Sequence, residues 1–170
     1  MSKACLTLLA LLVTAVSGIS TSRAADSEPP VFNRNWTAVS TTAMGITGDV
    51  RMTAESITFD DRVTFRWRAL GEIAPQPQGM GMDNFERFTV YELIDPKPRA
   101  IKSGVHLCGW PKYQKNIPLP RYIAVSAYTG NLSDQLGIVV TSGKTPPKDV
   151  LYVKGDFCGS FGYAADKSQP

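Results

Sequence analysis

Residues 62–69 read RVTFRWRA, and this stretch decides the fold class. Apolar and polar side chains alternate along it, which is the period of an extended strand with one face in a core and the other in water. The expected core face carries Val63, Phe65, Trp67 and Ala69. The opposite face carries Arg62, Thr64, Arg66 and Arg68. We therefore expect a half-buried antiparallel strand whose outer face is basic and could receive an anionic partner.

Short stretches of β-forming residues, separated by Gly, Pro, Asn and Asp, continue on both sides of this strand. The expected strands lie at 36–42, 46–53, 56–59, 85–94, 100–109, 122–128, 135–141, 150–153 and 157–163. Asp60-Asp61 is typical of a tight hairpin turn, whereas 71–84 and 110–120 are long loops rich in Gly or Pro. No segment has the apolar period of an amphipathic helix.

This pattern predicts an all-β fold, a single antiparallel up-and-down barrel in which neighbours in sequence pair. A β-sandwich is the alternative. We favour the barrel because its closure leaves no exposed strand edge.

The first 24 residues have the three parts of a secretory signal peptide. Lys3 supplies a positive charge, and residues 4–16 form an apolar run. That run is too short for a membrane helix, which needs about 20 residues. Ser22 and Ala24 are the small residues that precede a cleavage site. We expect cleavage between Ala24 and Ala25, a periplasmic or secreted product, and no transmembrane segment in the mature chain.

The mature chain is expected to contain one β domain at 35–165, after a flexible leader at 25–34 and before a flexible tail at 166–170. Loss of Lys3 and Arg23 with the signal leaves 16 basic residues against 15 acidic ones, so the net charge falls from +3 to +1. A near-neutral domain lacks the positive surface that nucleic-acid binding requires. We therefore expect no nucleic-acid partner, and a monomer.

Cleavage leaves two cysteines, Cys108 and Cys158. Two thiols in an exported chain normally pair, and a disulfide closing a loop of this length stabilises a fold by roughly 4 kcal/mol in the chain-entropy model. Pairing would remove Cys108 as a nucleophile for His106, the single histidine, so we expect no Cys–His catalysis. The histidine and the cysteines also lack the spacing of a zinc site. We expect neither a metal nor a cofactor.

Two sets of residues are candidates for binding. Aromatic side chains could line a ligand cavity inside the barrel, and the candidates are Phe65, Trp67, Phe88 and Tyr91. The long loops could form a binding rim, because binding residues often sit on loops held by a rigid scaffold. The rim candidates are Met80, Met82, Trp110 and Tyr113.

The segment Arg34-Asn35-Trp36 begins the first expected strand, and a series of hairpins and a late disulfide follow it. This plan resembles that of the lipocalins and the wider calycin group. It is also similar to small exported bacterial β-barrel proteins of unassigned function, including lysozyme inhibitors. The resemblance implies an up-and-down barrel that binds small apolar molecules or proteins. The lipocalin motif has Gly two residues before the Trp, where this chain has Arg34, and no functional residue is carried over.

The sequence thus favours a non-enzymatic exported binding protein. Its partner would be a small apolar molecule in the barrel or an envelope protein at the loop rim. An envelope structural or interaction protein without a pocket is the first alternative. A hydrolase that uses carboxylates is the second.

The pairing of Cys108 with Cys158 leads to a direct test. We expect the intact mass of the exported protein to show no alkylated thiol without reductant, and two after reduction. Two alkylated thiols without reductant would contradict the disulfide.

Overall fold

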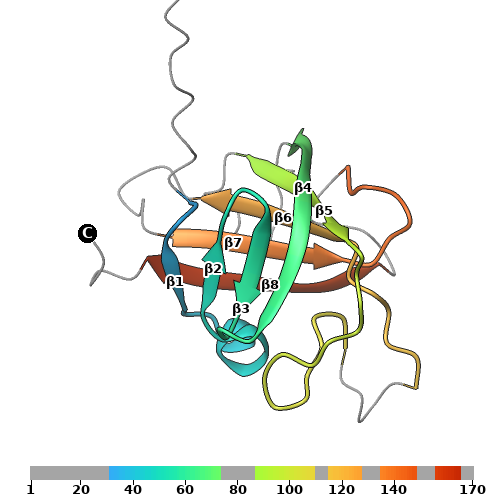
Figure 1. Cartoon of the computed structure of the whole chain (residues 1–170), viewed down its shortest axis with the longest axis horizontal. Coiled ribbons are helices and arrows are strands. Elements are labelled where there is room, and N and C mark those ends of the chain that lie inside the picture. The colour runs from blue at the N-terminus through green and yellow to red at the C-terminus, as the bar shows by residue number, and fades with distance from the viewer. Residues whose placement is uncertain (1–30, 74–86, 110–114, 128–134, 149–155, 166–170) are drawn as a thin grey trace, which may run out of the picture.

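The computed structural model describes residues 31–73, 87–109, 115–127, 135–148 and 156–165. Eight antiparallel strands in these ranges close into a barrel in chain order (Figure 1). They are β1 (Asn35–Ala38), β2 (Val50–Met52), β3 (Ser56–Phe59), β4 (Val63–Ile73), β5 (Phe88–Ile94), β6 (Tyr122–Ala127), β7 (Gln135–Thr141) and β8 (Phe157–Ala165). In Figure 1, β2 to β4 stand upright in front of β6 to β8, which run across behind them. The predicted up-and-down barrel is confirmed, and the sandwich is not formed.

Strand β4 has the alternation expected of it over its first half. Phe65 and Trp67 are buried, whereas Arg66 and Arg68 are exposed. Ala69 was expected in the core but is exposed. Ala69 is paired with Tyr91, and a change of register follows between Ala69 and Gly71, a bulge after which β4 continues to Ile73 into the expected loop.

The hairpin turn before β4 is also confirmed. Asp60 and Asp61 both have positive φ angles, 50° and 51°, and the backbone N–H of Arg62 donates to the Phe59 carbonyl at 3.0 Å. Two successive residues of positive φ give the turn a twist that matches the flanking strands.

The region from 39 to 49 differs from the expected pair of strands. Strand β1 ends at Ala38, and a single π-helical turn, η1 (Ala43–Thr47), leads to the short β2. The Ser40 hydroxyl accepts a hydrogen bond from the Ala43 N–H, and the Thr47 hydroxyl donates to the Ala43 carbonyl. Such local hydroxyl bonds compete with strand pairing, which the β-forming composition did not anticipate. Gly48 then turns the chain with φ +61°, and a Cβ there would lie 2.4 Å from an Asp60 carboxylate oxygen.

The core occupies the barrel interior and receives side chains from all eight strands. The buried strand residues of this cluster are Trp36, Val50, Met52, Ile57, Phe59, Val63, Phe65, Trp67, Tyr91, Leu93, Ile123, Val125, Leu136, Ile138, Val140, Phe161, Tyr163 and Ala165. Segments outside the strands add to it at both ends of the barrel. Val31 and Phe32 pack against it before β1, and Ile101 and Leu107 pack against it between β5 and β6.

The leader expected at 25–34 is described only from Val31, and this part is bound to the barrel. The indole N–H of Trp36 donates to the Val31 carbonyl at 3.1 Å, and the Asn33 N–H donates to the Met52 carbonyl at 2.8 Å. Val31 and Phe32 are apolar and pack against the core. The neighbouring prolines had led us to expect a flexible segment here.

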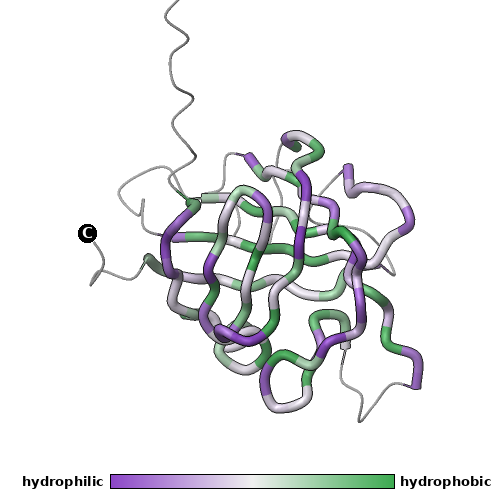
Figure 2. Tube along the Cα trace, viewed as in Figure 1, coloured by the Kyte–Doolittle hydropathy of each residue, from purple (hydrophilic) through white to green (hydrophobic). Residues whose placement is uncertain are grey.

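A second apolar cluster lies on the outer face of β5, β6 and β7. Its buried members are Phe88, Val90, Tyr122, Ala124 and Val139. Strands β6 and β7 are therefore buried on both faces, and Figure 2 shows them as largely hydrophobic. Part of the segment after β7 contacts this face, since the Tyr122 hydroxyl donates to the Lys144 carbonyl. The exposed wall of the barrel is the outer face of β2, β3 and β4.

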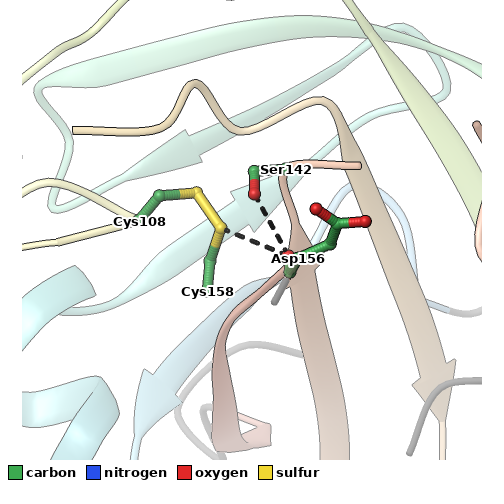
Figure 3. Close-up of a disulfide and its surroundings, with 4 residues drawn as sticks. All are labelled: Cys108, Ser142, Asp156 and Cys158. Carbon is green, nitrogen blue, oxygen red and sulfur yellow. Dashed lines mark hydrogen bonds between the residues drawn. A yellow bond between two sulfur atoms is a disulfide. The ribbon is translucent and has the colours of Figure 1, made fainter. Parts of the chain in front are cut away.

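Because the strands alternate in direction, every connection lies at one of two ends. We call the end where β4 and β8 begin and β5 ends the disulfide end. The Cys108–Cys158 disulfide lies there, with an S–S distance of 2.05 Å and Cα atoms 4.3 Å apart. Figure 3 shows it beside Asp156, whose carbonyl accepts hydrogen bonds from the Ser142 hydroxyl and N–H. The predicted disulfide is confirmed, and it fastens the segment after β5 to the first residues of β8.

In the described ranges, no helical segment has the length and apolar character that a membrane crossing requires.

A buried hydroxyl pair joins η1 to the barrel. The Thr47 and Tyr163 hydroxyl oxygens lie 2.7 Å apart. Burial raises the pKa of the Tyr163 phenol well above its usual value; the hydrogen bond with Thr47 opposes this shift, and the charge of Asp49 adds to it. In the unfolded chain the phenol loses its proton near pH 10, whereas in the folded protein it keeps it. High pH therefore favours unfolding, and this effect is absent below pH 10.

The higher pKa of Tyr163 in the folded protein than in the unfolded chain predicts how Tyr163→Phe changes stability with pH. At pH 7 we expect a loss of about 1 kcal/mol, the value of one buried hydrogen bond. Above pH 10 the unfolding free energy of the wild type should fall more steeply than that of the variant, by up to about 1.4 kcal/mol per pH unit. Urea denaturation from pH 7 to 11 measures both slopes. Parallel slopes would contradict a buried, protonated Tyr163.

Candidate functional site

The four aromatic residues expected to line a cavity do not share one face. Phe65, Trp67 and Tyr91 belong to the interior cluster, whereas Phe88 belongs to the outer cluster. Phe88 and Tyr91 are both on β5 and three residues apart, and residues at odd separations point to opposite faces of a strand. The prediction that these four residues line one cavity is therefore wrong for Phe88. The odd separation of Phe88 and Tyr91 along the strand already indicated this in the sequence.

The three interior aromatic residues are packed against other side chains. Trp67 and Tyr91 stack with ring centroids 4.1 Å apart, and Phe32 meets the Tyr91 ring edge-on at 6.4 Å. Phe59 and Phe65 form a further edge-on pair at 6.2 Å. Burial raises the pKa of Tyr91, and its hydrogen bond with Thr89 opposes that shift. Rings in mutual contact fill space, so these three residues contribute to the packed core.

The rim candidates Met80, Met82, Trp110 and Tyr113 lie outside the described residues. Of the described strands, β4 ends opposite the disulfide end and β5 ends at the disulfide end.

His106 and Cys108 do not form a nucleophilic pair. The Cys108 sulfur is bonded to Cys158, so no thiol is available. The expected strand at 100–109 is a series of turns with two isolated bridges, in which the backbone of His106 pairs with Ala100 and Gly109. Within the ranges the structure describes, no three His, Cys, Asp or Glu side chains gather in a group suited to a metal ion.

A hollow of about 330 Å³ opens on the outside of the barrel at the disulfide end. Its lining residues are Thr64, Phe65, Arg66, Ile94, Asp95 and Arg99. Arg66 pairs with Ile94 across β4 and β5, and Asp95 turns the chain with a φ of 57°. The chain then returns, and the Arg99 guanidinium donates to the Thr64 carbonyl at 3.1 Å. The same guanidinium carbon lies 5.9 Å from the centre of the Phe65 ring.

The described arginines on and beside β4 and β5 differ in their partners. Arg62, Arg68 and Arg87 form ion pairs with Asp60, Glu92 and Glu72 respectively. By contrast, Arg66 makes no side-chain hydrogen bond or ion pair within the described ranges, and Arg99 bonds only to a neutral carbonyl there. The Asp95 carboxylate is paired with Lys97 at 2.8 Å. Among the residues that the structure describes, two guanidinium groups in the hollow therefore lack a counter-charge.

A smaller hollow of about 80 Å³ lies on the outer face of β1 and β2. Its lining includes two carboxylates, Asp49 and Asp61, and the guanidinium of Arg51. One Asp49 oxygen already accepts a hydrogen bond from the Ala38 N–H at 2.9 Å. This space is too small for more than a few atoms of a ligand.

Arg66 was expected on the basic face of a strand, whereas Arg99 was not among the predicted site residues. Arg99 follows Pro96 and Pro98, which fix φ over the return of the chain. The alternation of Pro with charged residues was the available signal. It indicated the end of β5, but it could not indicate that the segment folds back over β4.

Comparison of the chain with protein-family models, curated proteins and solved structures found no match.

The packed interior predicts the effect of Trp67→Ala. We expect a loss of about 3–5 kcal/mol, because a ring with 2% exposure that stacks on Tyr91 would leave a cavity. Phe157→Ala is the matched control, since Phe157 is 50% exposed and its removal should change stability by no more than about 0.5 kcal/mol. Urea denaturation followed by circular dichroism compares the two. Equal, small effects would show that Trp67 borders open space.

Proposed function

We propose that this chain is a non-enzymatic exported binding protein whose partner contacts the outside of the barrel. The hollow at the disulfide end carries the proposal, because it combines a concave shape with two guanidinium groups that have no counter-charge among the described residues. Concave surfaces with a few converging polar groups are the usual form of binding sites.

The interior gives less support to an enclosed ligand. The aromatic side chains that would line such a cavity stack on one another, and apolar side chains from outside the strands pack against the core at both ends. A small apolar molecule would have to displace these contacts before it entered. A partner on the exposed wall displaces only water.

Export is supported by the disulfide and by the signal-like first 24 residues. Disulfides persist in oxidising compartments, and they are rare in the cytosol. Other exported proteins share that compartment, and a protein is the proposed partner.

A photo-crosslinking residue at the hollow tests this proposal. We would place p-benzoylphenylalanine at position 94, where Ile94 is 42% exposed beside Arg66, and separately at position 39, where Val39 is 51% exposed near η1. In the native envelope we expect a discrete crosslinked protein from position 94 and none from position 39. The matched exposure of the two sites controls for simple accessibility.

Native mass spectrometry of the purified protein provides the opposing measurement. The proposal expects the bare mass of the mature chain. A reproducible extra mass of a few hundred daltons, together with no crosslink from position 94, would overturn it in favour of a small molecule inside the barrel.

A further inference from the structure

We propose that the hollow formed by Arg66, Arg99 and Phe65 binds a single carboxylate on an apolar stem. The inference rests on the proposed function and names the chemistry that the site recognises.

The hollow is fixed by the backbone rather than by side chains that move freely. Its floor and one wall come from β4, which pairs with β3 on one side and β5 on the other. The opposite wall is the segment 95–99, in which Pro96 and Pro98 restrict the backbone. The hydrogen bond from Arg99 to the Thr64 carbonyl closes this segment onto β4. The walls of the hollow are therefore ordered before a ligand enters. Binding then costs little conformational entropy, which favours it.

The guanidinium groups of Arg66 and Arg99 favour an anionic ligand in the hollow. Arg99 uses one nitrogen on the Thr64 carbonyl and retains further N–H groups, while Arg66 has all its donors free of partners within the described ranges. Guanidinium N–H groups match the geometry of a carboxylate, and such charge-assisted bonds are about twice as strong as neutral ones. The one carboxylate in the lining, Asp95, is occupied by Lys97.

An apolar side chain borders the guanidinium groups, and this sets the rest of the ligand. Ile94 is 42% exposed beside Arg66, whereas the Phe65 ring under Arg99 is buried. A fully hydrated anion such as phosphate would leave the Ile94 side chain uncovered. A carboxylate attached to a hydrocarbon or aromatic stem would cover it. The volume of about 330 Å³ is at the lower limit of ligand sites, which suits one such group.

A carboxylate of this kind has two sources. It can be a free organic acid, or it can be the C-terminus or an acidic side chain of a protein partner. Both present the same chemistry to Arg66 and Arg99, so probes of each kind are needed.

The first experiment uses 3-phenylpropionate, with 3-phenylpropanamide as the uncharged control. We expect the acid to shift the side-chain Nε–Hε signals of Arg66 and Arg99 in nitrogen–proton NMR spectra with millimolar affinity. The amide, which has the same shape without the charge, should bind at least ten-fold more weakly. Equal effects of the two probes, or no shift with either at 20 mM, would overturn the inference.

Arg66→Gln and Arg68→Gln form a matched pair of variants. Both residues are exposed on the same face of β4, but Arg68 is already paired with Glu92 and lies outside the hollow. We expect Arg66→Gln to weaken binding of the acid about ten-fold and Arg68→Gln to change it less than two-fold. Because the exposed Arg66 side chain makes no hydrogen bond or ion pair with the described residues, its loss should leave folding intact. Equal loss in both variants would mean a diffuse charge effect and no site.

Two short peptides then separate the sources. One ends in Phe with a free carboxylate, and the other has the same sequence with an amidated end. Preference for the free peptide over 3-phenylpropionate assigns the site to a protein end, and preference for the acid assigns it to a small molecule.

If no carboxylate binds but position 94 still crosslinks to a protein, this inference fails and the proposed function survives. If the acid binds and no protein crosslinks, the proposed function fails instead.

Discussion

Pairing of the first strand with the last is the constraint on which the structure depends. Trp36, Thr37 and Ala38 of β1 lie opposite Ala165, Ala164 and Tyr163 of β8, so the sheet has no free edge. Closure brings side chains from all eight strands into one interior, where Trp36 and Tyr163 are almost completely buried. It also fixes which connections share an end of the barrel. The hollow exists because β4 begins and β5 ends at the same end.

Much of this architecture could be predicted from local patterns. The alternation around Phe65 and Trp67 fixed the orientation of β4, and Asp60-Asp61 marked a turn with two positive φ angles. The disulfide followed from the count of cysteines and an expected export signal. These features depend on neighbours in sequence or on composition, which a single chain shows directly.

The features that were missed depend on contacts between distant segments. Composition at 39–49 favoured a strand, but hydroxyl bonds of Ser40 and Thr47 and the approach of Gly48 to Asp60 produced η1 instead. Phe88 was placed with the interior residues because aromatic content was weighed above strand period. Arg99 meets Phe65 only because the chain reverses after Asp95. The strand face that carries Arg66 was predictable, but the hollow was not.

The arrangement of the two ends has a consequence for how the molecule can be held. The described chain enters the barrel at Val31 and leaves it at Ala165, and β1 and β8 are paired, so both points lie together at one end. The disulfide and the hollow lie at the other end. A tether on either terminus would therefore leave the hollow facing outward, whereas immobilisation through the disulfide end would hide it. The same proximity makes the barrel a natural subject for circular permutation, with new termini opened at the Asp60-Asp61 turn.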